Sequence, residues 1–221
     1  YLHTAYRRQR QMCIRDRRIP NIPESLDWEG DAHVRGEVVM PLDVFRAKYA
    51  SIAPNPRNLA AGSLRQKTAD AGKGDAADLT FHAYGVMFPS AEARHPDSPP
   101  PPAFTNDSEA IDWLESNHIA AAGNEVVEGE DDDTVTQAIL QVTKRWTQNR
   151  DSADWEIDGV VIKLDDLAKR ELLGQTAHHP RWALAWKFPP EEASTVVMGV
   201  DWQTGRTGTV TPVARVAPVT V

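Results

Sequence analysis

Two short stretches in the second half of the chain alternate large apolar residues with small or polar ones. The first runs from Glu156 to Leu164 and the second from Trp182 to Phe188. A period of two is typical of a β-strand with one buried face. In each stretch one lysine, Lys163 or Lys187, falls on the face that also carries glycine or alanine. The pattern predicts two ammonium groups on an uncrowded sheet face, which suits an anionic ligand with a flat, bulky part.

Length and composition set the broad class. The 221 residues suffice for one large domain, or for one domain and part of another. The formal charge of −8 argues against a general polyanion-binding protein, so nucleic acid would have to be contacted through local basic patches. No apolar run is long enough for a transmembrane helix, and no secretory signal pattern is visible. The single cysteine, Cys13, excludes a disulfide framework and a cysteine zinc site in this sequence, and indicates a reducing, intracellular compartment.

Residues 1–18 differ from the rest of the sequence. They hold six arginines, one acidic residue and the only cysteine, and removing them would change the formal charge from −8 to −13. The stretch from Arg8 to Arg17 resembles translated adapter sequence at the end of a sequencing contig. We expect 1–18 to be non-native or a disordered basic arm, and we exclude it from the fold argument. A native protein would then begin upstream.

The first half of the remaining sequence predicts strands and helices around several loops. We expect a strand over 33–40 and a helix from Pro41 to about Ala50, with the proline in the first turn. A second helix over 57–66 would place Arg57 and Arg65 roughly 80° apart around its axis, close enough to serve one surface, although the spacing alone favours two solvated arginines. A strand over 79–88 is followed by a proline-rich loop over 89–102.

The second half adds helices and a β-rich end. Ser108 is a candidate cap for a helix, and an amphipathic helix runs from Val135 to Trp146 behind an acidic stretch, 128–133. We interpret this stretch as a solvated helix start rather than a metal site. A short helix over 166–173 ends at Gly174, and from residue 195 onward two β segments flank a glycine turn at 205–208.

Six motifs then indicate a family. In chain order they are VRGEV (34–38), NPRN (55–58), AAGSLRQ (60–66), EIDGVVIK (156–163), PRWALAWKFP (180–189) and GRTG (205–208). Over residues 19–221 this order and spacing resemble bacterial NAD-dependent DNA ligases. The resemblance implies an α+β nucleotidyltransferase (adenylation) fold with antiparallel sheets lining a nucleotide cleft. This domain would occupy 19–194 without its N-terminal part, and the first strands of an OB-fold β-barrel would occupy 195–221.

The resemblance also implies a reaction and the residues that serve it. In this family a lysine attacks the adenylyl phosphorus of NAD. The AMP then passes to the 5′-phosphate of a nick in double-stranded DNA, and the 3′-hydroxyl displaces it. By similarity Glu37, Lys163 and Lys187 bind NAD, at the nucleoside, the adenine and the phosphate respectively. The resemblance implies that four arginines contact DNA or its 5′-phosphate: Arg57, Arg65, Arg150 and Arg206. Asp158 is implied as a supporting acidic residue, although it could instead fix the turn before its strand.

Two cofactors follow from the resemblance. Magnesium is implied by the phosphoryl-transfer chemistry, although no dedicated metal cage can be read from the sequence. Zinc is implied only in a domain of the full-length ligase outside this sequence.

One departure from the family limits what this chain can do. The nucleophilic lysine belongs to a Lys-x-Asp-Gly motif upstream of the Glu37 strand, and no such string is present. The nearest one, Lys73-Gly74-Asp75-Ala76, ends in alanine and follows Glu37, so we predict a loop there. We therefore expect a catalytically incomplete piece of a ligase that is inactive alone, monomeric, in the bacterial cytoplasm at the nucleoid, and without membrane contact.

Two alternatives stay open. A non-catalytic module on the same fold could bind nicked DNA or nucleotide. An ATP-dependent ligase or a capping-type guanylyltransferase would share the two lysines, but these proteins do not usually carry the strings at 55–58 and 62–66.

Overall fold

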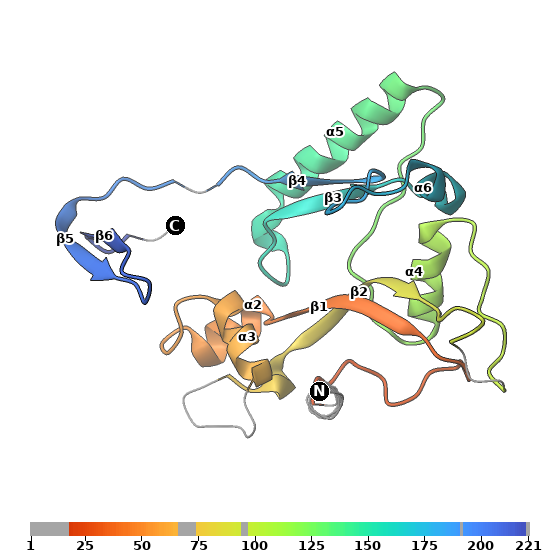
Figure 1. Ribbon diagram of the computed structural model, residues 1–221, viewed down its shortest axis with the longest axis horizontal. Coiled ribbons are helices and arrows are strands. Elements are labelled where there is room, and N and C mark those ends of the chain that lie inside the picture. Colours follow the sequence, from red (N-terminus) through yellow and green to blue (C-terminus); the bar gives the residue numbers. More distant parts are fainter. Residues whose placement is uncertain (1–17, 66–73, 94–96, 191, 220–221) are drawn as a thin grey trace. The chain divides into compact units, whose positions relative to one another are not determined.

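The structure, a computed structural model, describes residues 18–65, 74–93, 97–190 and 192–219. Its described part mixes helices with three two-stranded sheets, β1–β2, β3–β4 and β5–β6 (Figure 1). The chain divides into two compact units between Trp186 and Lys187. In chain order the elements are β1 (His33–Val39), α2 (Leu42–Val44), η1 (Phe45–Tyr49), α3 (Pro56–Arg65), η2 (Ala76–Asp78), β2 (Thr80–Met87), α4 (Asp107–Ser116), α5 (Asp132–Gln148), η3 (Arg150–Ser152), β3 (Gly159–Lys163), α6 (Leu167–Leu173), β4 (Ala183–Lys187), β5 (Val197–Thr204) and β6 (Val210–Val216).

Strands β1 and β2 form an antiparallel ladder with one irregularity. Arg35 pairs with Gly85, and the next residue of β1 pairs with Ala83, so Tyr84 has no partner in the register of β1. Two residues of β2 therefore oppose one of β1, which is the pattern of a β-bulge. A bulge redirects the backbone of the extra residue, and Tyr84 becomes important below for that reason.

Gly36 is required by the close approach of β2 to β1. A Cβ built at Gly36 would lie 2.3 Å from the ring of Phe81 and 2.5 Å from the carbonyl oxygen of His82. Neither distance is compatible with a side chain unless the strands shift. The glycine of the VRGEV motif is therefore explained by strand packing.

The helix predicted from Pro41 to Ala50 is present with a different geometry. Pro41 is extended, with φ −58° and ψ 138°, and is the residue before α2 rather than part of its first turn. After α2 the chain continues as η1, a π-helical turn in which the Ala50 N–H donates to the Phe45 carbonyl. The turn carries the buried Tyr49, whose hydroxyl donates to Asp78.

Two hydrophobic clusters hold the first sheet to its helices. One joins η1, α3 and η2, of which α3 contacts β1, and the other packs α4 against β2. The buried members of the first are Ile19, Met40, Tyr49, Ala60, Ala76 and Leu79. Those of the second are Ala83, Ile111, Leu114 and Ile119. The helix predicted over 57–66 corresponds to α3, which contributes Ala60 to the first cluster.

Helix α4 begins two residues earlier than a Ser108 cap predicts, and it has a different cap. Asn106 is its N-cap, and the carboxylate of Glu109 reaches back to the Asn106 N–H as part of a capping box. Ser108 does not cap the helix; its hydroxyl donates to Asp165 at 2.9 Å. The prediction failed because the partner of Ser108 is 57 residues away in sequence.

Helix α5 and the β3–β4 pair confirm most of the predicted pattern. Asp131 caps α5 by accepting the Thr134 N–H at 2.8 Å, so the acidic stretch is a helix start. The helix packs against β3 (Figure 1). The predicted burial along 182–188 is wrong in part. Phe188 is buried, but the Leu184 and Trp186 side chains are 61% and 41% exposed, because no described element covers that part of β4.

The second unit contains a β-hairpin, as predicted. Strands β5 and β6 pair antiparallel, with Thr204 opposite Val210. The Gly205 N–H donates to the Thr209 carbonyl at 2.8 Å, and Gly208 has φ 85°, a conformation that favours glycine. The two glycines of the GRTG motif therefore close a tight turn.

Candidate functional site

Lys163, the last residue of β3, directs its ammonium group to β2. Its Nζ lies 3.0 Å from the Tyr84 carbonyl oxygen and 3.4 Å from Oδ2 of Asp107. The same atom is 5.9 Å from the centre of the Tyr84 ring. The bulge at Tyr84 explains why a ladder carbonyl can accept this bond. With 27% of its side chain exposed, Lys163 is held in place and is still reachable by a ligand.

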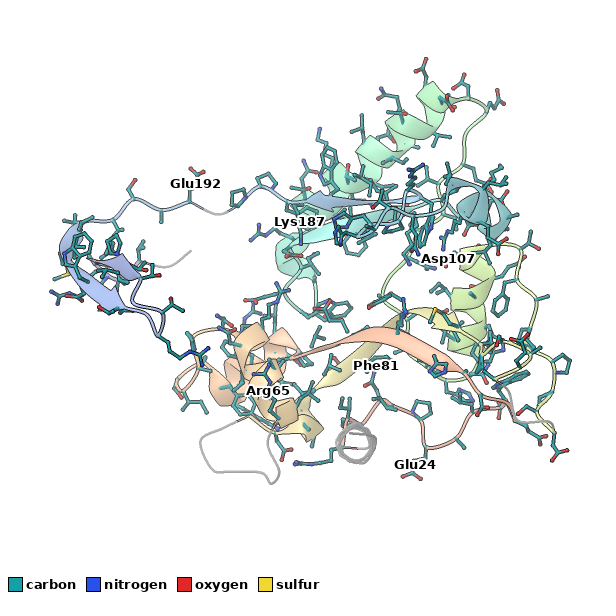
Figure 2. The ribbon with its side chains drawn as sticks, in the orientation of Figure 1. Glu24, Arg65, Phe81, Asp107, Lys187 and Glu192 are labelled. Atoms are coloured by element: carbon teal, nitrogen blue, oxygen red, sulfur yellow. The ribbon has the colours of Figure 1, made fainter. Side chains whose placement is uncertain are left out.

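Asp107 is shared between two cations. Its Oδ1 accepts from NH1 of Arg170 at 2.8 Å, while its Oδ2 faces Lys163. Figure 2 labels Asp107 at the start of α4. Burial by itself would raise the pKa of Asp107, but the Arg170 hydrogen bond and the charges of Lys163 and Arg170 outweigh it and hold the pKa below its ordinary value. Asp107 is therefore a carboxylate at neutral pH.

Arg170 is fixed more firmly than Lys163. Among the described residues it is the one buried residue that carries a charge, and its Nε donates to the Leu164 carbonyl. Its guanidinium lies 4.3 Å from the centre of the Trp182 ring, which is a cation–π contact. Arg170 is thus an anchored cation that leaves Asp107 little freedom to move.

The start of α4 is tied to the loop between β3 and α6. The Asp107 N–H donates to the Asp165 carbonyl at 2.9 Å, and the Leu167 N–H donates to the Thr105 carbonyl at 3.0 Å. The Ser108 N–H and hydroxyl both bind the Asp165 carboxylate, at 2.8 and 2.9 Å. These bonds fix Asp107 relative to the end of β3, where Lys163 lies.

Glu37 lies on β1, exposed, opposite His82 of β2. The His82 ring stacks on Trp155, with centroids 4.0 Å apart and planes 26° apart. Burial lowers the pKa of His82, against the opposing effects of a hydrogen bond to the Ala121 backbone and the charge of Asp154. Opposite residues of a ladder project on one face, so Glu37 and His82 share the face that meets the segment leading into β3.

Lys187 ends β4, which pairs with β3 in one sheet. The Leu164 N–H, just after β3, donates to the Trp182 carbonyl, just before β4, at 2.9 Å. The end of β3 therefore lies beside the start of β4. Lys163 and Lys187, each the last residue of its strand, lie at opposite ends of this pair.

The predicted DNA-contacting arginines come from different elements. Arg57 and Arg65 lie near the two ends of α3, and Arg65 is exposed. Arg57 is joined to Asp158, which precedes β3, by an ion pair of 3.6 Å. Arg150 begins η3, and the exposed Arg206 lies in the hairpin turn of the second unit. The structure thus brings two predicted site residues, Arg57 and Asp158, together.

The string at 73–76 falls partly outside the described residues, because Lys73 lies outside them. Asp75 accepts the Ala77 N–H at 3.1 Å as the cap of η2 and pairs with Arg18. Gly74 and Asp75 belong to no helix or strand, which agrees with the predicted loop, but Ala76 is the first residue of the short 3₁₀ helix η2.

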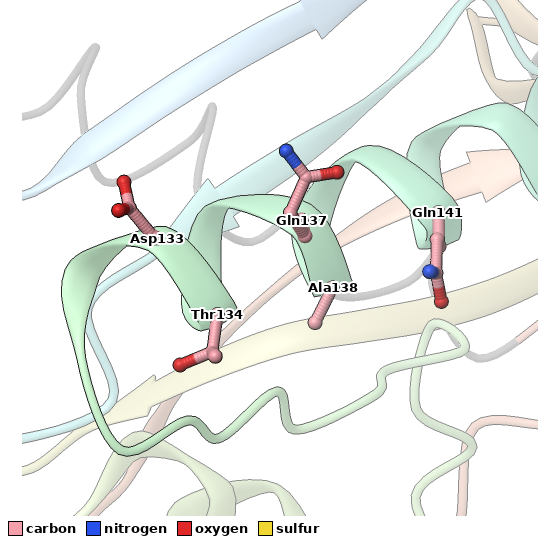
Figure 3. A pocket seen from close by; sticks show the side chains of 5 residues that line it. All are labelled: Asp133, Thr134, Gln137, Ala138 and Gln141. Carbon is pink, nitrogen blue, oxygen red and sulfur yellow. The ribbon is translucent and has the colours of Figure 1, made fainter.

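The remaining candidates are a surface hollow, a metal site and a membrane-spanning helix. A shallow hollow along α5 is lined by one carboxylate, a hydroxyl, two amides and Ala138 (Figure 3), and none of the predicted site residues borders it. Within the described ranges no group of three or more His, Cys, Asp or Glu side chains could hold a metal ion. In the same ranges no helix is both long enough and apolar enough to cross a membrane.

Sequence reasoning missed Asp107, Arg170 and the Tyr84 carbonyl. Asp107 is 56 residues from Lys163 and 63 from Arg170. No periodicity or motif links positions so far apart. The interior glycine of β2, Gly85, is a weak signal for the bulge at Tyr84, but the position of the bulge depends on the register with β1.

Comparison with known proteins identifies the class. A family model described as the NAD-dependent DNA ligase adenylation domain matches residues 11–191. The chain therefore belongs to this family. The matched range begins inside the segment 1–18 and ends close to the division between the two units.

Individual relatives carry the name DNA ligase. The protein of Acinetobacter baylyi is 39% identical over 215 residues, covering 92% of this chain and 29% of the relative. That of Bacillus cytotoxicus is 37% identical over 210 residues, covering 92% and 29%. That of Lacticaseibacillus casei is 37% identical over 208 residues, covering 91% and 28%. The chain thus spans less than a third of the length of these relatives.

Proposed function

We propose that this chain supplies the adenylate-binding part of an NAD-dependent DNA ligase. Such an enzyme seals nicks by enzyme adenylation from NAD, AMP transfer to the DNA 5′-phosphate and phosphodiester formation. The observation that carries the proposal is the ammonium group of Lys163, held beside Tyr84 in a chain of this family. A fixed positive charge next to an aromatic ring matches a ligand that has both a flat base and an anionic phosphate.

Glu37 and Lys187 complete the proposed nucleotide contacts. An ionised glutamate only accepts hydrogen bonds, so Glu37 would accept from a nucleoside N–H or O–H. Lys187 would place a point charge against a phosphate, where positive charge stabilises phosphoryl transfer. Both side chains are exposed, which a direct contact with ligand requires.

The arginines are proposed to contact nicked double-stranded DNA. Arginine forms bidentate hydrogen bonds with phosphate, and Arg57, Arg65, Arg150 and Arg206 would act on the backbone rather than on base sequence. The Arg57–Asp158 pair is largely exposed, at 71% and 62%, so water screens it and a DNA phosphate could replace the carboxylate. Asp158 would then hold Arg57 ready while DNA is absent.

The finer description of the fold belongs to the same proposal. We assign the mixed α/β first unit to a nucleotidyltransferase domain, and the β5–β6 hairpin to the first strands of an OB-fold. Two observations support this assignment: the chain belongs to the family, and an antiparallel ladder, β1–β2, in the first unit precedes the antiparallel β5–β6 ladder of the second. A monomer in the bacterial cytoplasm, at the nucleoid, is the proposed working form, because the proposed substrate is chromosomal DNA.

The metal and the nucleophile are treated separately. We include Mg²⁺ because it neutralises phosphate charge during phosphoryl transfer. The described residues offer no cluster of ligands for the ion, so no step is assigned to it. The sequence has no Lys-x-Asp-Gly string, and we therefore propose no covalent step for this chain alone. A non-catalytic module that binds nucleotide or nicked DNA is the alternative that this absence favours.

The test is nucleotide binding by the chain and a lysine variant. We expect AMP and NAD to bind the wild-type chain and Lys163→Ala to weaken both by about tenfold, the effect of one charge-assisted hydrogen bond. Lys144→Ala is the matched control, because it removes the same charge from the exposed surface of α5. Isothermal titration calorimetry at fixed ionic strength gives the dissociation constants. Equal affinities for wild type and Lys163→Ala would reject the proposed site.

A further inference from the structure

Asp107 lies beside the proposed nucleotide site, although neither the motifs nor the family assignment gives it a role. Its two carboxylate oxygens are divided, one to Lys163 and one to Arg170. Arg170 has only 10% of its side chain exposed, against 27% for Lys163. One partner is therefore a fixed anchor and the other is a cation that a ligand can reach.

Backbone contacts make the carboxylate a fixed point. Asp107 is the first residue of α4, and its own N–H is bound to the Asp165 carbonyl two residues after Lys163. Ser108 binds the Asp165 side chain through both its N–H and its hydroxyl. A side chain held at its backbone and at one oxygen has little freedom left, so its second oxygen defines a direction for Lys163.

The ammonium group of Lys163 has three N–H donors. One N–H donates to the Tyr84 carbonyl and a second donates to Asp107. These two bonds together set the direction of the third N–H. The Tyr84 ring lies 5.9 Å from Nζ, so this arrangement also sets where the charge stands relative to an aromatic face. Without Asp107, a lysine with four rotatable bonds would sample many directions.

We propose that Asp107, anchored by Arg170, is a positioning residue that aims the Lys163 ammonium at the nucleotide. The inference rests on the proposed function, because it requires Lys163 to contact the nucleotide. It extends that function by assigning a second residue to the affinity of the site. Asp107 touches no ligand in this scheme and acts only through Lys163.

Substitutions at Asp107 separate positioning from plain electrostatics by the direction of the effect. Removing a negative charge close to a bound phosphate would by itself strengthen AMP binding. Lys163 and Arg170 face different oxygens of Asp107, and asparagine replaces one of these oxygens by an NH₂ donor, so the two cations cannot both keep their acceptors. Positioning therefore predicts weaker AMP binding for Asp107→Asn, in spite of the favourable change in charge.

Asp107→Glu provides the second variant. It keeps the charge and moves the carboxylate by one methylene, so electrostatics predicts unchanged binding and positioning predicts a loss. We expect about fivefold weaker AMP binding for both variants, the scale of one partly exposed charged hydrogen bond. Asp112→Asn and Asp112→Glu are the matched controls on the exposed side of α4, and should bind AMP within about twofold of wild type.

A measurement without ligand tests the underlying contact. A double-mutant cycle of Asp107→Asn and Lys163→Met, followed by urea unfolding, should show a coupling of about threefold in the unfolding constant. Circular dichroism of each variant verifies that it is folded before titration.

The outcomes are distinct. If Lys163→Ala binds AMP like wild type, the proposed function fails. If Lys163→Ala weakens binding but either Asp107 variant binds AMP as well as wild type or better, the positioning role alone is overturned. Zero coupling in the cycle also overturns it. Weaker binding in both Asp107 variants, together with a measurable coupling, supports it.

Discussion

At the scale of single residues, His82 connects the stability of the β1–β2 ladder to the pH of the solution. Its ring stacks on Trp155, and burial is the main reason that its pKa is lowered. The folded state therefore binds a proton less readily than the unfolded chain, whose histidine has a pKa of about 6.5. Stability from this group is fully present above about pH 6.5, and is lost as the pH falls from there to the folded pKa.

We predict that His82→Phe removes this pH dependence. Phenylalanine can keep the stacking on Trp155, but it does not titrate. The wild-type chain should lose about 0.5 kcal/mol of unfolding free energy between pH 7.5 and 5.5, a value reduced for partial solvent screening, and the variant should lose none. Urea denaturation at the two pH values measures the difference. Parallel losses in the two proteins would contradict the role given to His82.

The site could be predicted from sequence only where a residue carries its own signal. Lys163 lies at the end of a strand in which apolar residues alternate with small or polar ones, and inside one of the six motifs. The sequence therefore makes it a candidate site residue. Asp107 and Arg170 give no such signal, because their roles depend on contacts across 56 and 63 residues. The proposed roles of the arginines come from the family resemblance, and their spacing alone would not have supported them.

At the scale of elements, the close contact of β1 with β2 depends on Gly36. A Cβ at this position would overlap the Phe81 ring and the His82 carbonyl, whereas a Cβ at Gly85 on β2 meets nothing within 4 Å. The two glycines belong to the same ladder and differ in the space around them. They therefore form a matched pair for substitution.

We predict that Gly36→Ala destabilises the chain by about 2 kcal/mol, the usual cost of overpacking. Gly85→Ala should change the unfolding free energy by less than about 1 kcal/mol, and in the stabilising direction, because alanine has less freedom in the unfolded chain. Chemical denaturation of both variants at one pH gives the comparison. Equal stability of the two variants would show that strand proximity does not select the glycine at position 36.

Most elements could be predicted from local pattern. The alternation at 79–88, the apolar spacing at 135–146 and the cap–glycine pair at 166–174 each reflect forces between neighbours in sequence. The errors occur where distant groups decide. Ser108 binds Asp165 instead of capping α4, and Leu184 and Trp186 are exposed because burial of a strand face depends on which element covers it.

At the scale of the whole molecule, the order of six motifs carried the family assignment, and the family model confirms it over residues 11–191. The motifs predicted two domains, but the place at which the chain divides into two compact units and the position of Lys187 at the far end of the β3–β4 pair could not be read from them. Those features depend on register and on contacts between elements. We infer that this chain binds adenylate through Lys163 without forming a covalent bond to it.

Mass spectrometry of the chain with NAD and Mg²⁺ tests this claim most directly, because native and denaturing conditions separate binding from chemistry. We predict an NAD complex under native conditions, weakened in Lys163→Ala, and the unmodified mass under denaturing conditions. An AMP adduct that survives denaturation would contradict the claim by revealing a nucleophile in this chain. Absence of any native complex would contradict it by removing the nucleotide site.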